Sequence, residues 1–183
     1  MKKVIKFIII VLLIFATIHL LDDVYNVIMH TLYPLRHTEH IEKYSEKYDL
    51  DKYLVMAVIK AESNYIHDAH SGFARGLMQI TGDTAKWISS ELNVPFEDDD
   101  IEDPEKNIEF GCFYLSYLLE HYSGDEVLAL SAYNAGMGNV SKWLQNPKHS
   151  PDGSTLKNIP FRETREYIDR IKNYKVIYKK LYK

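Results

Sequence analysis

The N-terminal segment restricts the fold most, because it is too apolar to lie on the surface of a soluble domain. Three lysines lie within the first six residues, and the run from Phe7 to Leu21 is broken only by Thr17 and His19. Counted from Val4, the segment has 18 residues, close to the ~20 that a membrane-spanning helix needs. We therefore separate it from the globular part of the chain.

This segment reads as a permanent anchor or as a cleaved signal peptide. Residues 22–25 contain no small-residue cleavage site, and no cysteine follows for lipid attachment, so the anchor is favoured. Because the lysines precede the apolar run, the N-terminus is expected in the cytoplasm. We expect a single-pass protein of the cell membrane with an extracytoplasmic domain. The predicted parts are a membrane signal anchor (residues 1–24), a connector (25–37) and a globular domain (38–183).

Composition limits the globular part to a single ordinary domain. The chain has 183 residues and 46% hydrophobic content, which is enough for a real core. The single cysteine, Cys112, excludes an intrachain disulfide. A net charge of −4 argues against nucleic acid as a partner, since such binders are usually basic.

The pattern after residue 38 is helical almost throughout, and no convincing alternation of apolar and polar residues indicates a strand. Asp51 and Asp103 are expected to cap helices, Pro104 suits a first helical turn, and Gly124 is expected to end that helix. The fold class is therefore mainly α. The expected helices lie within residues 40–49, 51–63, 81–93, 103–124, 125–136, 138–147 and 161–182.

An acidic segment at residues 96–105 has seven carboxylates in ten positions. It lacks the ligand spacing and the loop glycine of an EF-hand calcium site. We interpret it as a solvated acidic loop rather than as a metal site.

The stretch YLVMAVIKAESNY, residues 53–65, places a carboxylate at the end of an apolar helix. The residues three, four and seven positions before Glu62 are all apolar: Ile59, Val58 and Val55. Burial and the nearby helix C-terminus both disfavour a negative charge, so the pKa of Glu62 should be raised. A carboxyl group still protonated near neutral pH can serve as a general acid. The alternative is a structural glutamate that pairs with an arginine or reaches solvent.

Further polar residues stand beside glycine-rich turns. Gly72 and Gly76 bracket a turn, and Gln79 follows the apolar pair that comes next. Tyr133 and Asn134 come directly before a second glycine-rich turn. Polar groups among apolar neighbours at tight turns are typical of a cleft wall.

Four motifs occur in an order that resembles a known family, the catalytic domain of soluble lytic transglycosylases, which is related to goose-type lysozyme. The resemblance covers residues 38 to 182 and implies a lysozyme-like helical domain with a groove for peptidoglycan glycan strands. The motifs are AES at 61–63, GLMQI at 76–80, AYNAG at 132–136 and IPFRETREYI at 159–168.

The resemblance also implies roles for individual residues. Glu62 matches the catalytic acid and base. From the residues alone, Gln79 would be a core-edge residue and Glu163 a first-turn helix charge. The residues expected to contact substrate are Ser71, Met78, Gln79, Tyr133, Asn134, Glu163 and Tyr167.

One segment departs from the family pattern. DAHSGFARGLMQ is one residue short, so counting forward from Glu62 assigns the substrate-contacting serine to Ser71, whereas counting back from Gly76 assigns that place to His70. Phe73 stands where a smaller residue is usual. It is expected either to stack on a sugar or to anchor the loop by packing.

The reaction implied by the resemblance is cleavage of the β-1,4 bond between N-acetylmuramic acid and N-acetylglucosamine, with 1,6-anhydro ends as products. Glu62 would act as acid and then as base, and no metal or cofactor is expected. The expected partners are peptidoglycan and the membrane. Two alternatives remain: a lysozyme-type hydrolase, and a non-catalytic peptidoglycan-binding module.

Overall fold

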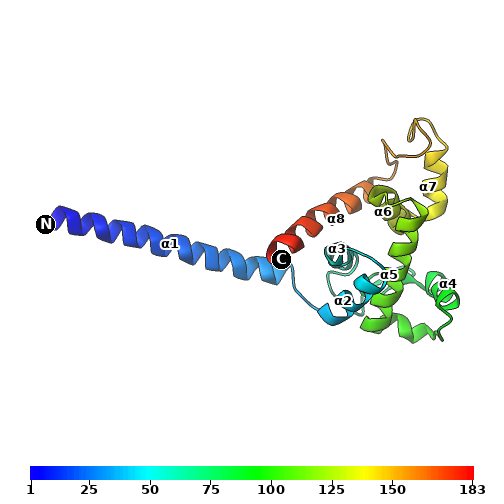
Figure 1. Ribbon diagram of the computed structural model, residues 1–183, viewed down its shortest axis with the longest axis horizontal. Helices are drawn as coiled ribbons and strands as arrows, with labels where there is room; N and C mark the ends of the chain where they lie inside the picture. Colours follow the sequence, from blue (N-terminus) through cyan, green and yellow to red (C-terminus); the bar gives the residue numbers. More distant parts are fainter. The chain divides into compact units, whose positions relative to one another are not determined.

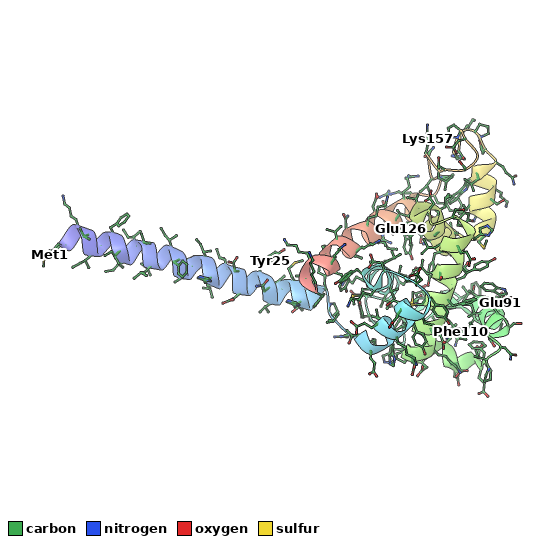
Figure 2. All side chains as sticks on the ribbon, viewed as in Figure 1. Met1, Tyr25, Glu91, Phe110, Glu126 and Lys157 are labelled. Carbon is green, nitrogen blue, oxygen red and sulfur yellow. The ribbon has the colours of Figure 1, made fainter.

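The computed structural model describes residues 1–183, which divide into two compact units, Met1–Leu35 and Arg36–Lys183. The first unit contains one helix, α1 (Lys2–Leu32), in which no residue is buried. Its side chains project on all sides, as Figure 2 shows around the labelled Met1 and Tyr25. The helix is long and apolar enough to cross a membrane, a test of length and composition that a signal sequence also passes.

Helix α1 continues well past residue 24, so most of the segment expected as a connector is helical. Residues 25–32 contain no proline or glycine, and the helix ends two residues before Pro34, which disfavours helical backbone in the residue that precedes it. Only residues 33–37 separate α1 from the next helix.

The second unit is mainly α-helical, as the sequence predicts. Helix α3 packs most extensively against α8, while the long helix α5 contacts α2, α4 and α6 (Figure 1). The helices are α2 (Thr38–Lys47), α3 (Lys52–Glu62), α4 (Gly82–Leu92), α5 (Pro104–His121), α6 (Glu126–Ala135), α7 (Met137–Leu144) and α8 (Arg162–Leu181), with a 3₁₀ helix, η1 (Asp98–Glu102).

The apolar run of α3 forms the centre of the core, because every residue from Leu54 to Ile59 is buried. Both predicted caps are confirmed. The Asp51 carboxylate accepts the Tyr53 N–H, and that of Asp103 accepts the Lys106 N–H. Helix α5 ends three residues before Gly124, the residue expected to end it.

A small antiparallel sheet, which the sequence analysis did not predict, lies between α3 and α4 in the chain. Its strands pair in the order β1 (His70–Ser71), β2 (Ala74–Arg75), β3 (Ile80–Thr81). Each strand has two residues, too few for an alternating pattern to be visible in the sequence.

The acidic segment is more ordered than the predicted loop. Glu97 and Asp100 cap η1 reciprocally. The Glu97 carboxylate accepts the Asp100 N–H, and the Asp100 carboxylate accepts the Glu97 N–H. Asp98 pairs with Arg75 at 2.8 Å and Asp100 with Lys106 at 2.7 Å. Local capping and ion pairs therefore give this segment a defined conformation, while Glu97, Asp98 and Asp99 remain exposed to solvent.

Candidate active site

Glu62 is the last residue of α3 and is half-buried. The Tyr167 hydroxyl, from α8, donates a hydrogen bond to Glu62 Oε1 at 2.5 Å. Burial raises the pKa of Glu62 to about 7, although the Tyr167 hydrogen bond and the positive charge of Arg170 oppose the rise; the negative charge of Glu163 adds to it. A carboxyl group that titrates near neutrality can both give and take a proton.

The backbone after Glu62 turns sharply through two left-handed residues, Asn64 (φ 53°) and Tyr65 (φ 64°). Such a φ is costly for a bulky residue and persists only where its surroundings enforce it. The Tyr65 N–H donates to Ser63 Oγ at 3.1 Å, and the buried Tyr65 ring contacts Tyr178. This turn fixes the end of α3 and with it the carboxyl group.

Tyr133 connects the AYNAG helix α6 to the GLMQ loop. Its hydroxyl donates to the Met78 carbonyl oxygen at 2.8 Å. Burial, and then the negative charge of Glu62, raise the pKa of Tyr133; burial likewise raises that of Tyr167. Both phenols near Glu62 are therefore neutral hydrogen-bond donors at physiological pH.

Met78, one of the residues expected to contact substrate, directs its side chain into the core, so that only its backbone faces other polar groups of the site. The side chain is fully buried and packs against Gly111 of α5. Its backbone instead links two polar residues, because the N–H donates to Asn107 Oδ1 at 2.7 Å and the carbonyl accepts from Tyr133.

Asn107 is a positioning residue that the sequence analysis missed. Its Nδ2 group donates to the carbonyl oxygens of Ile101 (2.7 Å) and Arg75 (3.0 Å), so each side-chain atom is paired with backbone. The sequence feature that could have indicated Asn107 is its position as a polar residue in the first turn of α5, beside the buried Ile108 and Phe110.

Ser71 and Gln79 form a polar pair beside the sheet. The Ser71 hydroxyl donates to Gln79 Oε1 at 2.5 Å, and Gln79 Nε2 donates to the carbonyl oxygens of Ala69 and Gly76 at 2.9 Å each. His70 instead faces Glu102, with Nε2 3.2 Å from its carboxylate. Adjacent strand residues point to opposite faces, so the Ser71 side chain lies on the face of Gln79 and that of His70 lies on the face of Glu102.

Asn134 and Glu163 lie at the junction of α6 and α8. The Thr164 hydroxyl donates to Asn134 Oδ1 at 2.7 Å, which leaves the Nδ2 group as the end that can donate to a ligand. Glu163 is exposed in the first turn of α8. Thr164 is buried and was not expected at the site.

Phe73 does not anchor the loop by packing, which was one of the two roles expected for it. It is 92% exposed at the tip of the β1–β2 hairpin, next to Gly72 with φ 60°. A two-residue tip directs its side chains away from the domain, so the ring has no core to enter.

Comparison with known families agrees with this geometry. Residues 39–155 match the model of the transglycosylase SLT domain, and the chain belongs to that family. It is 30% identical over 151 residues to the soluble lytic murein transglycosylase of Escherichia coli (strain K12), covering 80% of this chain and 23% of the relative. It is 27% identical over 169 residues to membrane-bound lytic murein transglycosylase C of Serratia proteamaculans (strain 568), covering 76% and 46%.

Solved structures show the same fold. The 70-kDa soluble lytic transglycosylase of Escherichia coli superposes with a TM-score of 0.73 and 29% identity, over 83% of this chain and 25% of that one. An inactive variant of lytic transglycosylase Slt from Pseudomonas aeruginosa gives 0.71 and 32%, over 81% and 25%. The chain thus spans about a quarter of the length of the first relatives that it matches. The lysozyme-like helical domain expected from the sequence is confirmed.

Proposed function

We propose that this chain is a lytic transglycosylase that cleaves the β-1,4 bond between N-acetylmuramic acid and N-acetylglucosamine in peptidoglycan. The observation that carries the proposal is the half-buried Glu62, whose pKa of about 7 lets it act first as an acid and then as a base. The Pseudomonas aeruginosa relative supports this choice of residue type, since its inactive form replaces a glutamate with glutamine.

In the proposed reaction, Glu62 donates its proton to the glycosidic oxygen and the bond to muramyl C1 breaks. The acetamido group of the same sugar stabilises the positive charge that develops at C1. The Glu62 carboxylate then takes the proton of the muramyl 6-hydroxyl, whose oxygen bonds to C1 and closes a 1,6-anhydro ring. No water is consumed, and Glu62 regains its proton.

The neighbouring residues receive supporting roles in this proposal. Tyr167 holds the Glu62 carboxyl in place through its hydrogen bond. Asn134 donates from Nδ2 to the acetamido oxygen, because Asn134 Oδ1 already accepts a hydrogen bond from the Thr164 hydroxyl. Ser71, oriented by Gln79, lines the groove on the sheet side, and the exposed Glu163 lines it on the α8 side.

The test is the mass of the products released from purified peptidoglycan. Muropeptides that end in 1,6-anhydromuramic acid are lighter by one water than those with reducing ends, and we expect only the lighter class. Reducing ends alone would identify a lysozyme-type hydrolase instead. Binding to peptidoglycan without any product would identify a non-catalytic module.

A variant pair tests the choice of acid. Glu62→Gln should abolish product release while leaving the fold intact, whereas Glu91→Gln, on the exposed outer side of α4 (Figure 2), should cleave like the wild type. Retained activity in Glu62→Gln would overturn the assignment.

We further propose that residues 1–24 anchor the chain in the cell membrane by a single pass and that residues 38–183, after the connector 25–37, form the catalytic domain on the cell-wall side. The length and apolarity of α1 and the membrane-bound relatives support membrane association, and the lysines at its start support the orientation. Protease added to spheroplasts should remove the domain if the orientation is right and leave it intact if the orientation is reversed.

A further inference from the structure

A connected series of aromatic rings leads away from the Glu62 site. From Tyr133, the centroid of Tyr114 is 5.4 Å away, and Trp87 follows 6.1 Å beyond Tyr114. Tyr117 lies 4.9 Å from Trp87, and the His121 ring is stacked 6.2 Å beyond Tyr117.

The series is built by two helices. Tyr114, Tyr117 and His121 are three and four residues apart on α5, so they share one face of that helix. Trp87 approaches this face from α4, which packs against α5. We call Tyr114, Trp87, Tyr117 and His121 the aromatic track.

Two hollows in the surface follow the aromatic track. The first, of about 290 Å³, is lined by Trp87, Tyr114 and Tyr117 together with Met137. The second, of about 830 Å³, also touches Met137 and is lined by His121 at the end of the track. The two hollows share Met137 and are therefore neighbours, and the first is lined by Tyr114, whose ring contacts that of Tyr133.

The rings of the track retain solvent-accessible surface, unlike core aromatics. Trp87, Tyr114 and Tyr117 are half-buried and His121 is exposed. None of their polar side-chain atoms is among the buried groups that lack a hydrogen-bond partner. Rings with one covered and one open side, and with polar tips at the surface, suit a ligand that is partly apolar and partly hydroxylated.

The charged residues that line the two hollows limit the class of ligand that can bind there. Neither hollow is lined by a lysine or an arginine, and the carboxylates present are those of Asp83 and Asp152. Phosphate-bearing polymers and nucleic acids would need cations here. Uncharged sugar rings need none, and their C–H faces can lie on aromatic rings.

We propose that the aromatic track binds the N-acetylhexosamine residues of the glycan strand that lie beyond the bond placed at Glu62. The inference rests on the proposed function, because its occupant is the same polymer. Trp87 and Tyr117 form the central platform of the track. The track makes binding depend on strand length, since a short oligosaccharide fills the Glu62 site without reaching Trp87.

The two tryptophans of the chain allow a direct test. Trp143 is buried against Phe161, so Trp143→Phe leaves Trp87 as the only indole reporter. In full-length protein that carries this change and Glu62→Gln, in detergent micelles, we would titrate the N-acetylglucosamine dimer and hexamer and follow tryptophan emission. The hexamer should shift the emission and bind at least tenfold more tightly than the dimer.

Variants of Tyr117 then separate stacking from folding. Tyr117→Ala should weaken hexamer binding about tenfold and leave dimer binding unchanged, while Tyr117→Phe, which keeps the ring, should bind like the parent. The matched control is Tyr53→Ala, which removes a half-buried ring at the start of α3 whose hydroxyl donates to the Tyr182 carbonyl oxygen and should not alter the preference for the hexamer.

The outcomes separate the two proposals. Equal binding of dimer and hexamer, unaffected by Tyr117→Ala, would overturn the aromatic track even if the wild type releases anhydro ends from peptidoglycan. Absence of any product from the wild type would overturn the proposed reaction, while the titration would still decide whether the track binds sugar.

Discussion

The ionisation of Glu62 is set by opposing effects on one carboxyl group. Removal of water favours the neutral acid, whereas the Tyr167 hydroxyl and the Arg170 charge favour the carboxylate, and burial is the largest effect. The pKa of Glu62 lies near 7 because burial raises it, while the Tyr167 hydrogen bond and the Arg170 charge limit the rise.

Tyr167→Phe should shift the pH dependence of cleavage. The wild-type rate should fall above about pH 7, where Glu62 loses its proton. Without the hydrogen bond that favours the carboxylate, the pKa rises further, so the fall should move up by about one pH unit. The measurement is kcat/KM for peptidoglycan from pH 5 to 9.

The control for this shift is Tyr44→Phe. It removes a different tyrosine–glutamate hydrogen bond, from Tyr44 to Glu105 at 3.0 Å, and should leave the profile in place. A Tyr167→Phe profile that coincides with the wild type would contradict the role of this hydrogen bond.

Glu62 should also make stability depend on pH. The pKa of Glu62 is 4.5 in the unfolded reference state and about 7 in the folded protein. Below pH 4.5 the group is therefore protonated in both the folded and the unfolded chain and does not change the free energy of unfolding. Between pH 4.5 and 7 the unfolded chain ionises first, and the free energy of unfolding falls by at most about 3 kcal/mol. Glu62→Gln should therefore be more stable than the wild type at pH 8 and equal to it at pH 4.

Urea unfolding at the two pH values measures this difference, with Glu91→Gln as the control that should show none. A Glu62→Gln effect of the same size at both pH values would point to packing rather than ionisation.

At the scale of elements, the sequence predicts what local chemistry determines. The helices, the Asp51 and Asp103 caps and the buried face that carries Glu62 follow from residue spacing within one segment. The two-residue strands and the reach of Asn107 from α5 to the GLMQ loop depend on tertiary contacts, which spacing within a segment does not reveal. The burial of the Met78 side chain could not be predicted for the same reason, because Gly111, 33 residues later, provides the space into which it packs.

The contact between α5 and the GLMQ loop can be tested with a pair of glycines. A Cβ on Gly111 would lie 2.7 Å from Met78 Cβ, whereas one on Gly138 would meet open space. Gly111→Ala should therefore lower the free energy of unfolding by about 1–3 kcal/mol, and Gly138→Ala, in α7, should leave it unchanged or raise it by up to ~1 kcal/mol. Denaturant unfolding of both variants is the measurement, and equal stabilities would contradict the close packing.

At the scale of the molecule, the two units should be separable. No residue of α1 is buried, so removal of residues 1–35 should leave the Tm of the domain within about 2 °C of its value in the full chain. The full chain should sediment with lipid vesicles, and the truncated chain should stay in the supernatant. Circular dichroism melting checks the first expectation, and a truncated chain that fails to fold would contradict it.

The five residues between α1 and α2 act as a tether. Residues 33–37 extend over about 17 Å at most. With the proposed anchor at residues 1–24, the reach of the domain from the bilayer would be set by residues 25–37, of which 25–32 are helical and add about 12 Å. A domain confined in this way would search for substrate along the membrane surface rather than through the surrounding volume.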